Sequence, residues 1–238
     1  MTPVKRCLVL IDLQNEFLSM SGNFPINKQS RVFLDKLPAL TALFRASGQP
    51  IFWIRSEYTF DDVEKYRQTN LRTGTHSSKV PCCTKGSAGA GFPDDVASLV
   101  ACSESDPADS VVITKTWFSA FKDTSLLEKL REREVTELYV GGLLTNVCVR
   151  ATVLDARDLG FDVVLVEDCL GWRKHTSHVR ALEEMLTYGA HIVSSNDLDT
   201  RRGKPADLPR LYYVNGSIPS WRVMMALYEK VCFQSWDQ

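Results

Sequence analysis

The stretch of sequence that decides the fold is Leu138-Tyr139-Val140-Gly141-Gly142-Leu143-Leu144-Thr145-Asn146-Val147-Cys148-Val149-Arg150. It predicts a buried strand, a tight glycine-rich turn, and then a helix whose first turn carries Cys148. Thr145 and Asn146 are good N-cap residues, and the apolar residues after them recur at helical spacing. The N-terminal end of a helix favours a thiolate and lowers the pKa of the thiol. The alternative is that Cys148 is a small apolar residue packing the helix on the sheet.

The composition narrows the class of protein. A chain of 238 residues fits one large α/β domain or two small ones. Its hydrophobic fraction of 44% is ample for a packed core, and its net charge of −1 gives no reason to expect nucleic acid or membrane partners. The start of the chain runs into a strand without a signal-peptide pattern, and the seven cysteines are scattered. We therefore expect reduced thiols in a cytoplasmic compartment.

Strands and helices alternate about six times along the chain. The expected strands are residues 7–13, 51–55, 110–115, 138–141, 161–167 and 191–193. The expected helices are residues 30–46, which Pro38 interrupts, 123–134, the helix of Cys148 up to Gly160, and 176–188. This alternation predicts an α/β fold of three layers, with a doubly wound, mostly parallel six-stranded sheet.

Two further segments bear on the domain organisation. Residues 56–108 are expected to be a long irregular stretch, and a loop of that length is usually a lid or a binding wall. The composition shifts after Asp197. We therefore expect a domain over residues 1–200 and a C-terminal extension over residues 201–238. Its one helix, residues 218–233, would begin with Pro219 and pack on the same domain or on a partner subunit.

Three expected strand ends carry groups that suit nucleophilic catalysis, namely Asp12, Lys115 and Cys148. A doubly wound sheet places the residues at the carboxyl ends of neighbouring strands side by side. Lys115 would hold Cys148 as a thiolate through its charge. Asp12 would take the thiol proton and return it to a leaving group. Pairing Asp12 with Lys115 would also let each charge tolerate burial.

The sequence resembles the isochorismatase-like hydrolases, also called the cysteine hydrolase superfamily, from about Cys7 to Val193. The resemblance rests on residues 10–17 (LIDLQNEF), 114–121 (TKTWFSAF) and 141–149 (GGLLTNVCV), and residues 81–90 (PCCTKGSAGA) are similar to a glycine-rich loop of many members. It implies a catalytic triad of Asp12, Lys115 and Cys148. It also implies a non-proline cis peptide between Leu143 and Leu144, which aims the backbone N–H groups of Leu144 and Cys148 at an oxyanion.

A metal site of the nicotinamidase type is not expected. Nicotinamidases, one branch of this family, hold a divalent metal with an aspartate and histidines. The corresponding stretches here contain Glu57, Thr59 and Cys82. Glu57 could replace the aspartate, whereas Thr59 and Cys82 are poor replacements for imidazoles, and adjacent cysteines such as Cys82 and Cys83 have poor chelate spacing. We expect neither a metal nor a cofactor.

Aromatic residues flank the strand ends and are expected to bind a small planar substrate: Phe17, Tyr58, Trp117 and Phe118. Core or dimer packing is their alternative role. Gln14, which follows the Asp12 turn, would either orient the substrate or fix that turn.

Two enzyme functions and one non-catalytic function remain open. The first is a cysteine hydrolase in which Cys148 attacks a carbonyl-type carbon and cleaves an amide C–N bond. The alternative is isochorismate hydrolysis, a vinyl-ether cleavage to pyruvate and a dihydroxybenzoate precursor with Asp12 as general acid. Family members of that second kind typically lack the cysteine, so Cys148 favours the first. The third is a non-catalytic interaction protein. The resemblance also implies a homo-oligomer, either a dimer or a tetramer, that acts on a small molecule.

Overall fold

The computed structural model describes residues 5–62, 82–104 and 110–198. Its internal contacts divide the chain into two units, Met1–Arg201 and Arg202–Gln238. The helix expected over residues 218–233 lies outside the described residues, so the fold below is that of the first unit.

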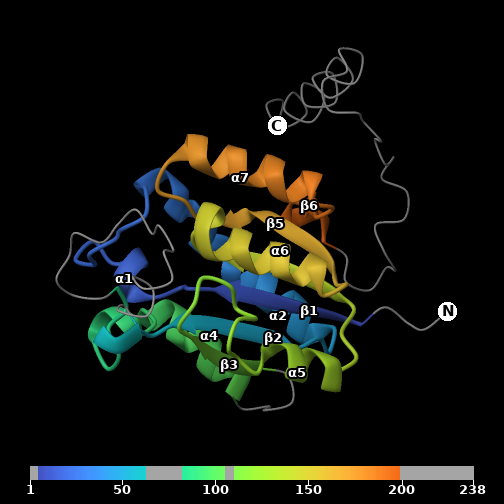
Figure 1. The fold of residues 1–238 in the computed structure, drawn as a ribbon, viewed down its shortest axis with the longest axis horizontal. Coiled ribbons are helices and arrows are strands. Elements are labelled where there is room, and N and C mark those ends of the chain that lie inside the picture. Colours follow the sequence, from blue (N-terminus) through green and yellow to red (C-terminus); the bar gives the residue numbers. More distant parts are fainter. Residues whose placement is uncertain (1–4, 63–81, 105–109, 199–238) are drawn as a thin grey trace. The chain divides into compact units, whose positions relative to one another are not determined.

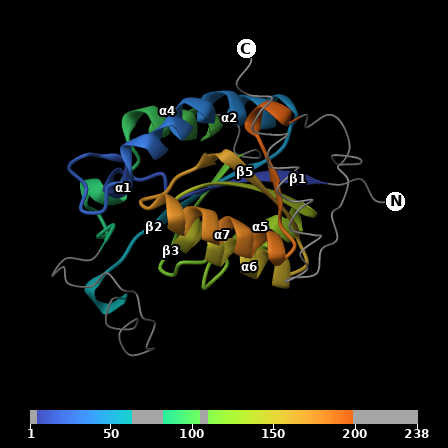
Figure 2. The ribbon, with the colours of Figure 1, turned by 90° about the horizontal axis from the view of Figure 1, so that it is seen from above.

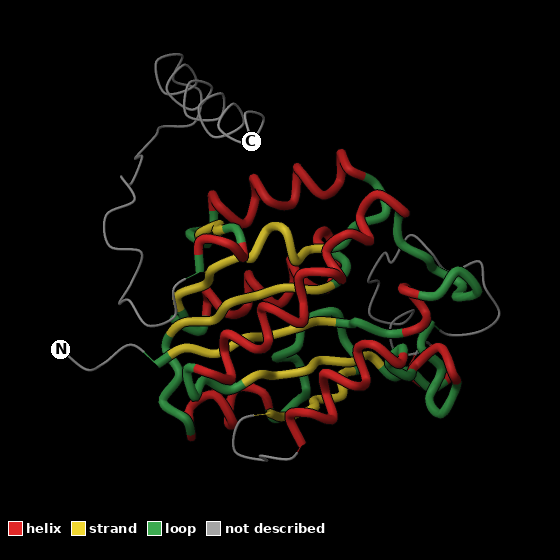
Figure 3. The backbone as a smooth tube through the Cα atoms, turned by 180° about the vertical axis from the view of Figure 1, so that it is seen from behind, coloured by secondary structure: helices red, strands yellow, loops and turns green. Residues whose placement is uncertain are grey.

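The centre of this unit is a six-stranded parallel sheet in the order β3-β2-β1-β4-β5-β6 (Figure 3). The strands are β1 (Arg6–Ile11), β2 (Ile51–Ser56), β3 (Ser110–Lys115), β4 (Glu137–Gly142), β5 (Asp162–Leu170) and β6 (His191–Val193), and each neighbouring pair is parallel. The chain runs outward from β1 to β3 and then returns to β4 on the other side of β1. The strand order therefore reverses between β1 and β4, where open α/β sheets bind their ligands. The predicted doubly wound α/β fold is confirmed.

Helices cover both faces of the sheet (Figure 1). On one face lie α1 (Asn15–Leu18), the 3-10 helix η1 (Lys28–Lys36), α2 (Leu37–Ala46) and α4 (Asp94–Glu104). On the other lie α5 (Leu126–Glu132), η3 (Thr145–Val149), α6 (Arg150–Asp158) and α7 (His175–Thr187). Figure 2 shows α2 and α4 on one side of the strands and α5, α6 and α7 on the opposite side. Two short 3-10 helices, η2 (Ala88–Ala90) and η4 (Ser195–Asp197), complete the described elements.

Strand β1 shows how the sequence builds these three layers. Cys7, Val9 and Ile11 belong to the hydrophobic cluster under α5, α6 and α7, whereas Leu8 and Leu10 belong to the cluster under α2 and α4. Side chains alternate between the faces of a strand, so an unbroken apolar run is what a strand buried on both faces requires.

Several element boundaries differ from the predicted ones. The expected helix over residues 30–46 is the 3-10 helix η1 followed by α2, with Pro38 in the first turn of α2. Proline is tolerated there because the N–H that it lacks has no partner in the first turn. The stretch expected to be irregular contains α4, whose Val96 and Val100 lie one turn apart and face the core. Strand β5 continues to Leu170, because its pairing with β4 resumes beyond a register shift after Val140.

Candidate active site

The groups expected to carry the chemistry lie at the carboxyl ends of three strands. Asp12 follows β1, Lys115 ends β3, and Cys148 lies in η3, which follows β4. The close approach of β4 to β1 depends on Gly142, whose φ is +106° and whose added Cβ would overlap the Ile11 carbonyl oxygen. Only glycine fits this position without strain. This close approach places the segment of Cys148 where the strand order reverses, between β1 and β4.

Asp12, Lys115 and Ser56 form a closed hydrogen-bond ring inside the protein. Lys115 Nζ donates to Asp12 Oδ2 at 2.9 Å and to Ser56 Oγ at 2.7 Å, and Ser56 Oγ donates to Asp12 Oδ1 at 2.9 Å. The side chains of Lys115 and Asp12 are 0% and 1% exposed. The ring satisfies both charges, which a buried ion pair requires.

Sequence reasoning did not identify Ser56. The position of Ser56 in the sheet could have indicated its role. Ser56 pairs with Lys115 across β2 and β3, and β2 lies between β1 and β3. A hydroxyl at the carboxyl end of the middle strand can reach both neighbours.

The ammonium of Lys115 remains charged despite its burial. Burial lowers the pKa of Lys115, but its interactions with Asp12 above all, and then with Cys148 and Tyr58, outweigh this effect and hold that pKa well above its ordinary value. Two of the three N–H bonds of the ammonium point to Asp12 and Ser56. The ammonium also interacts with Cys148 and Tyr58.

Cys148 is 8% exposed and interacts with both partners of the ion pair. Burial raises the pKa of the Cys148 thiol above its usual range, and the charge of Asp12 raises it further, while Lys115 acts in the opposite direction. The net direction is opposite to the one expected at a helix terminus, whereas Lys115 favours the thiolate, as expected. The loss of hydration and the neighbouring carboxylate outweigh the favourable field. The site at rest contains a protonated thiol next to a carboxylate.

The turn before Cys148 also differs from its prediction. The N-cap of η3 is Leu144, without a side-chain cap, so Thr145 and Asn146 do not cap the helix. The Thr145 hydroxyl instead donates to the Gly171 carbonyl at 3.0 Å and shares a hydrogen bond of 2.9 Å with His178 Nδ1. The single hydroxyl proton is used by Gly171, so His178 Nδ1 is the donor in the second bond. These bonds attach η3 to the end of β5 and to α7.

The expected cis peptide between Leu143 and Leu144 is also wrong. The described residues contain no cis peptide bond. Leu144 is extended, with φ −82° and ψ 138°, and this trans conformation already leads the chain from β4 into η3. Among the described residues, no group accepts a hydrogen bond from the Leu144 N–H, so this donor remains available next to Cys148.

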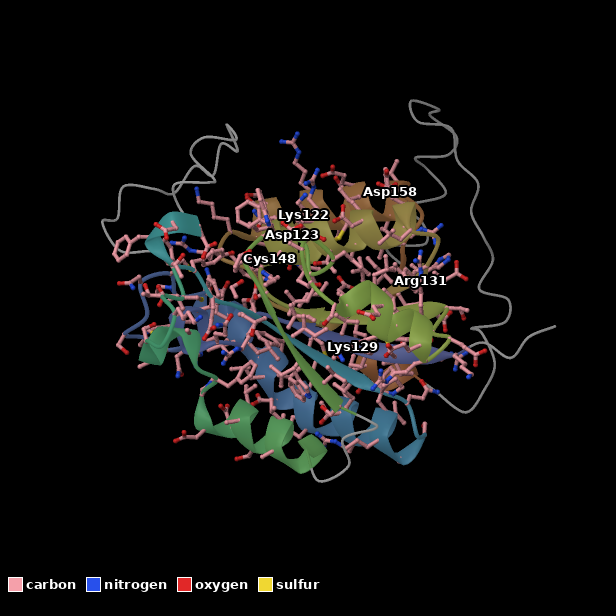
Figure 4. All side chains as sticks on the ribbon, turned by 60° about the horizontal axis from the view of Figure 1, so that its bottom comes forward. Lys122, Asp123, Lys129, Arg131, Cys148 and Asp158 are labelled. Carbon is pink, nitrogen blue, oxygen red and sulfur yellow. The ribbon has the colours of Figure 1, made fainter. Side chains whose placement is uncertain are left out.

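The loop that follows β3 is attached to the segment of Cys148. The Ala120 N–H donates to Thr152 Oγ1 at 3.0 Å, and that hydroxyl donates to the Cys148 carbonyl at 2.8 Å. Figure 4 labels Cys148 and, on this loop, Lys122 and Asp123. Trp117 Nε1 donates to Asp123 Oδ2 at 2.8 Å, so the loop is also closed internally.

The five residues expected to contact substrate have different surroundings. Phe17 and Tyr58 are buried in the cluster of the α2 face, Trp117 packs against that cluster, and Phe118 packs against the other, which contains Cys148. Gln14 is fully buried, and its amide donates to the carbonyls of Ser56 and Ala90 and accepts from the Ser56 N–H. These bonds support its alternative role, which is to fix the turn.

The residues at the positions of the nicotinamidase metal ligands do not fit a metal ion. The Glu57 carboxylate accepts from Arg55 Nη2 at 2.6 Å, and the Thr59 hydroxyl donates to Asp62 Oδ2 at 2.7 Å. The Cys82 thiol is directed at Cys83. A carboxylate already paired with a cation, a hydroxyl used as a donor and a thiol do not replace one carboxylate and two imidazoles. No group of three or more His, Cys, Asp or Glu placed for a metal occurs among residues 5–62, 82–104 and 110–198.

The match to known proteins covers the whole of this sheet and its site. A model of the isochorismatase domain matches residues 6–197. The chain belongs to the isochorismatase family. This isochorismatase-family chain is 27% identical over 190 residues to an uncharacterized isochorismatase family protein, PncA of Bacillus subtilis, and the match covers 79% of this chain and 99% of that protein. It is 25% identical over 181 residues to the ureidoacrylate amidohydrolase RutB of Cronobacter sakazakii, covering 70% of this chain and 74% of RutB.

Solved structures agree with this assignment. The crystal structure of the nicotinamidase PncA from Bacillus subtilis matches with a TM-score of 0.70 at 26% identity, over 80% of this chain and 100% of that one. The predicted family and the predicted enzyme class, a hydrolase of the isochorismatase-like family, are confirmed. In the described part of the chain, no helix has the length and apolar character needed to cross a bilayer.

Proposed function

We propose that this isochorismatase-family hydrolase cleaves the C–N bond of a small carboxamide, with Cys148 as nucleophile, Asp12 as proton acceptor and donor, and Lys115 as the fixed cation. One observation carries the proposal. The protonated Cys148 thiol interacts with both Asp12 and Lys115, and these two groups form an ion pair that is buried beside it. A thiol that is not ionised at rest needs a base at hand, and a nucleophile with an adjacent base is the common arrangement for acyl transfer.

The first half of the reaction uses these groups in a fixed order. As the sulfur attacks the carbonyl carbon, its proton moves to Asp12, and the carbonyl oxygen becomes an oxyanion. The N–H groups of Leu144 and Cys148 would stabilise that oxyanion. The C–N bond then breaks, Asp12 returns the proton to the departing nitrogen, and a thioester on Cys148 remains.

The second half repeats the proton transfer with water. The water oxygen attacks the thioester carbon while Asp12 takes a proton from that water. The C–S bond then breaks. The acid product leaves, and the proton on Asp12 restores the Cys148 thiol. Lys115 keeps its charge throughout, held by Asp12 and Ser56, and opposes the negative charge that develops on sulfur.

The relatives support an amide rather than an ether as substrate. Those described above include a nicotinamidase and an amidohydrolase. Isochorismate hydrolysis with Asp12 as general acid would leave Cys148 without a role. Phe17, Tyr58, Trp117 and Phe118 would form the walls of the substrate pocket, and we propose that the active protein is a homo-oligomer.

The test is a release assay with the purified full chain over a panel of nicotinamide, ureidoacrylate, other small carboxamides and isochorismate. We expect ammonia release from at least one amide. Cys148→Ala should lower kcat/KM by at least about 10³-fold, whereas Cys82→Ala, a matched loss of one thiol, should not. Hydroxylamine should trap the acyl group from Cys148 as a hydroxamate.

Two results would contradict the proposal. Full turnover of isochorismate by Cys148→Ala would assign the ether reaction, because that reaction needs no thiol. If Cys148→Ala, Asp12→Ala and Lys115→Ala all retained the biological activity, the protein would act without catalysis.

A further inference from the structure

Cys82 and Cys83 form a second pair of thiols that the proposed reaction does not use. Cys82 Sγ lies 3.8 Å from Cys83 Sγ, within hydrogen-bonding contact. Cys82 is half-buried, whereas Cys83 is fully buried in the cluster of the α2 face. Cys82 is therefore the more exposed residue of the pair.

The backbone at Cys83 is held in an uncommon conformation. Its φ is +48°, in the left-handed region that residues other than glycine rarely adopt. The surrounding hydrogen bonds fix it there. The Tyr58 N–H donates to the Cys83 carbonyl at 3.1 Å, and the Lys85 N–H donates to the Tyr58 carbonyl at 3.0 Å. Strained residues persist only where such contacts determine them, and they concentrate at functional sites.

The same bonds connect the thiol pair to the candidate active site. Tyr58 lies two residues after Ser56, which holds Asp12 and Lys115, and the intervening Glu57 N–H donates to the Lys115 carbonyl at 3.1 Å. The negative charge of Asp12 also reaches Cys83, where it helps raise the pKa of that thiol, after the larger effects of the hydrogen bond with Cys82 and of burial. A short series of backbone hydrogen bonds thus links Cys83 to the segment that holds the ion pair.

We propose that Cys82 and Cys83 are a redox-sensitive modification site, which a peroxide oxidises to a vicinal disulfide and so slows the hydrolase. In the first step the Cys82 sulfur attacks peroxide. An S–O bond forms, the O–O bond breaks, and water leaves, so that Cys82 becomes a sulfenic acid. In the second step the Cys83 sulfur attacks Cys82. The S–S bond forms, the S–O bond breaks, and a second water leaves. The two thiols lose two electrons and the peroxide gains them.

The geometry of adjacent residues makes this disulfide easy to reverse. Neighbouring Cα atoms lie about 3.8 Å apart across a trans peptide, which is shorter than the Cα separation of about 4.4–6.8 Å that disulfides usually span. The bond is therefore strained, and strained disulfides are the readily reduced, regulatory ones. Its formation shortens the sulfur separation to about 2.05 Å. The Cys82–Cys83 peptide must rotate to allow this. The Cys83 carbonyl that accepts from the Tyr58 N–H belongs to the next peptide, which is joined to the rotating one at the Cys83 Cα.

The chemical part of the proposal is tested on the full chain by peptide mapping. Trypsin should release residues 80–85, VPCCTK, which contain both thiols and no other cysteine. After hydrogen peroxide and then iodoacetamide, we expect this peptide to be lighter by two hydrogens and to carry no alkyl group, and dithiothreitol should restore double alkylation. The proposal is overturned if both thiols remain alkylatable, if Cys82 is over-oxidised without a link, or if it pairs with another cysteine.

The regulatory part rests on the proposed function and uses the amide identified there. Peroxide should lower the turnover of the wild-type chain by about tenfold, since displacements of about 1 Å cost this much or more, and dithiothreitol should restore it. Cys82→Ala should have unchanged basal turnover and resist peroxide. Equal loss in Cys82→Ala would place the inactivating oxidation outside this pair and overturn regulation by it. If the amidase proposal itself fails, the unoxidised chain shows no turnover, while the mapping result still stands.

Discussion

Replacing Lys115 with methionine is expected to destabilise the protein by about 3–5 kcal/mol, because it leaves the Asp12 carboxylate buried without its cation. The side chains of Lys115 and Asp12 are 0% and 1% exposed, so water cannot take over the lost contact. The change also removes the donor to Ser56 Oγ. An ion pair on the surface would contribute at most about 1 kcal/mol. The measured cost of Lys115→Met therefore distinguishes a buried pair from a surface pair.

The double variant Asp12→Asn/Lys115→Met tests whether this cost comes from the unpaired charge. It removes both charges, and replacing a whole buried pair is often neutral or stabilising. We expect its free energy of unfolding to lie within about 1 kcal/mol of the wild-type value, so that the two substitutions are coupled by at least about 2 kcal/mol. Urea unfolding of the four proteins measures this. Additive effects, or a cost of Lys115→Met below about 1 kcal/mol, would refute the buried pair.

The same ion pair has a signature at high pH. The pKa of Lys115 is raised by its surroundings in the folded protein, so the folded state retains its proton to higher pH than the unfolded chain does. The stability from Lys115 is therefore fully present below the unfolded pKa of about 10.4 and is lost as the pH rises towards the folded pKa. The double variant lacks Lys115 and should lose less stability above about pH 10.4.

Three further predictions concern the surroundings of the site. Cys148 should react with iodoacetamide ever faster up to and beyond about pH 8.5, because its pKa is raised above that ordinary thiol value; a rate that levels off at lower pH would contradict this. The pKa of His178 is lowered to about 4, by burial and by the charge of a neighbouring histidine. The unfolded chain therefore binds a proton at this residue at higher pH than the folded protein does. Up to about 3 kcal/mol of the stability present above pH ~6.5 should be lost as the pH falls to about 4. Acid titration of unfolding in His178→Asn should lack this loss, while the exposed His191→Asn should keep it. Gly142→Ala should lower the free energy of unfolding in urea by at least about 3 kcal/mol, because it combines a positive φ with overlap of backbone atoms. The control Gly48→Ala, at a φ of +62° with open space around the new Cβ, should cost about 1 kcal/mol. Equal costs of the two substitutions would contradict the overlap at Gly142.

The parallel sheet and the position of the site could be predicted from the sequence because both depend on local patterns. Unbroken apolar runs mark strands buried on both faces, and their alternation with helices requires parallel connections. Polar residues that end such runs, as Asp12 and Lys115 do, then gather at one edge of the sheet. Their contact at 2.9 Å follows from the topology together with the length of the lysine side chain.

The pKa of Cys148 could not be predicted in this way. The sequence indicates that a helix follows, and with it a favourable field. It does not give the depth of burial or the distance to a neighbouring carboxylate, which decide the direction of the shift. The sequence also does not show whether Thr145 caps the helix or bonds elsewhere. In the structure the Thr145 side chain bonds to Gly171 and His178. Both depend on contacts with β5 and α7, which lie later in the chain.

A protonated nucleophile has a consequence for selectivity. Cys148 is 8% exposed and keeps its proton in the free protein, so it presents a weak nucleophile to peroxides and other electrophiles that enter without the substrate contacts. A bound carbonyl changes this balance, because the negative charge can move from sulfur to an oxygen that faces N–H donors while Asp12 takes the proton. Attack and proton transfer then occur together, and the reactive thiolate exists only when it is consumed. Cys82 lies outside this arrangement and, of the five cysteines whose burial the structure describes, it is the one that is not buried.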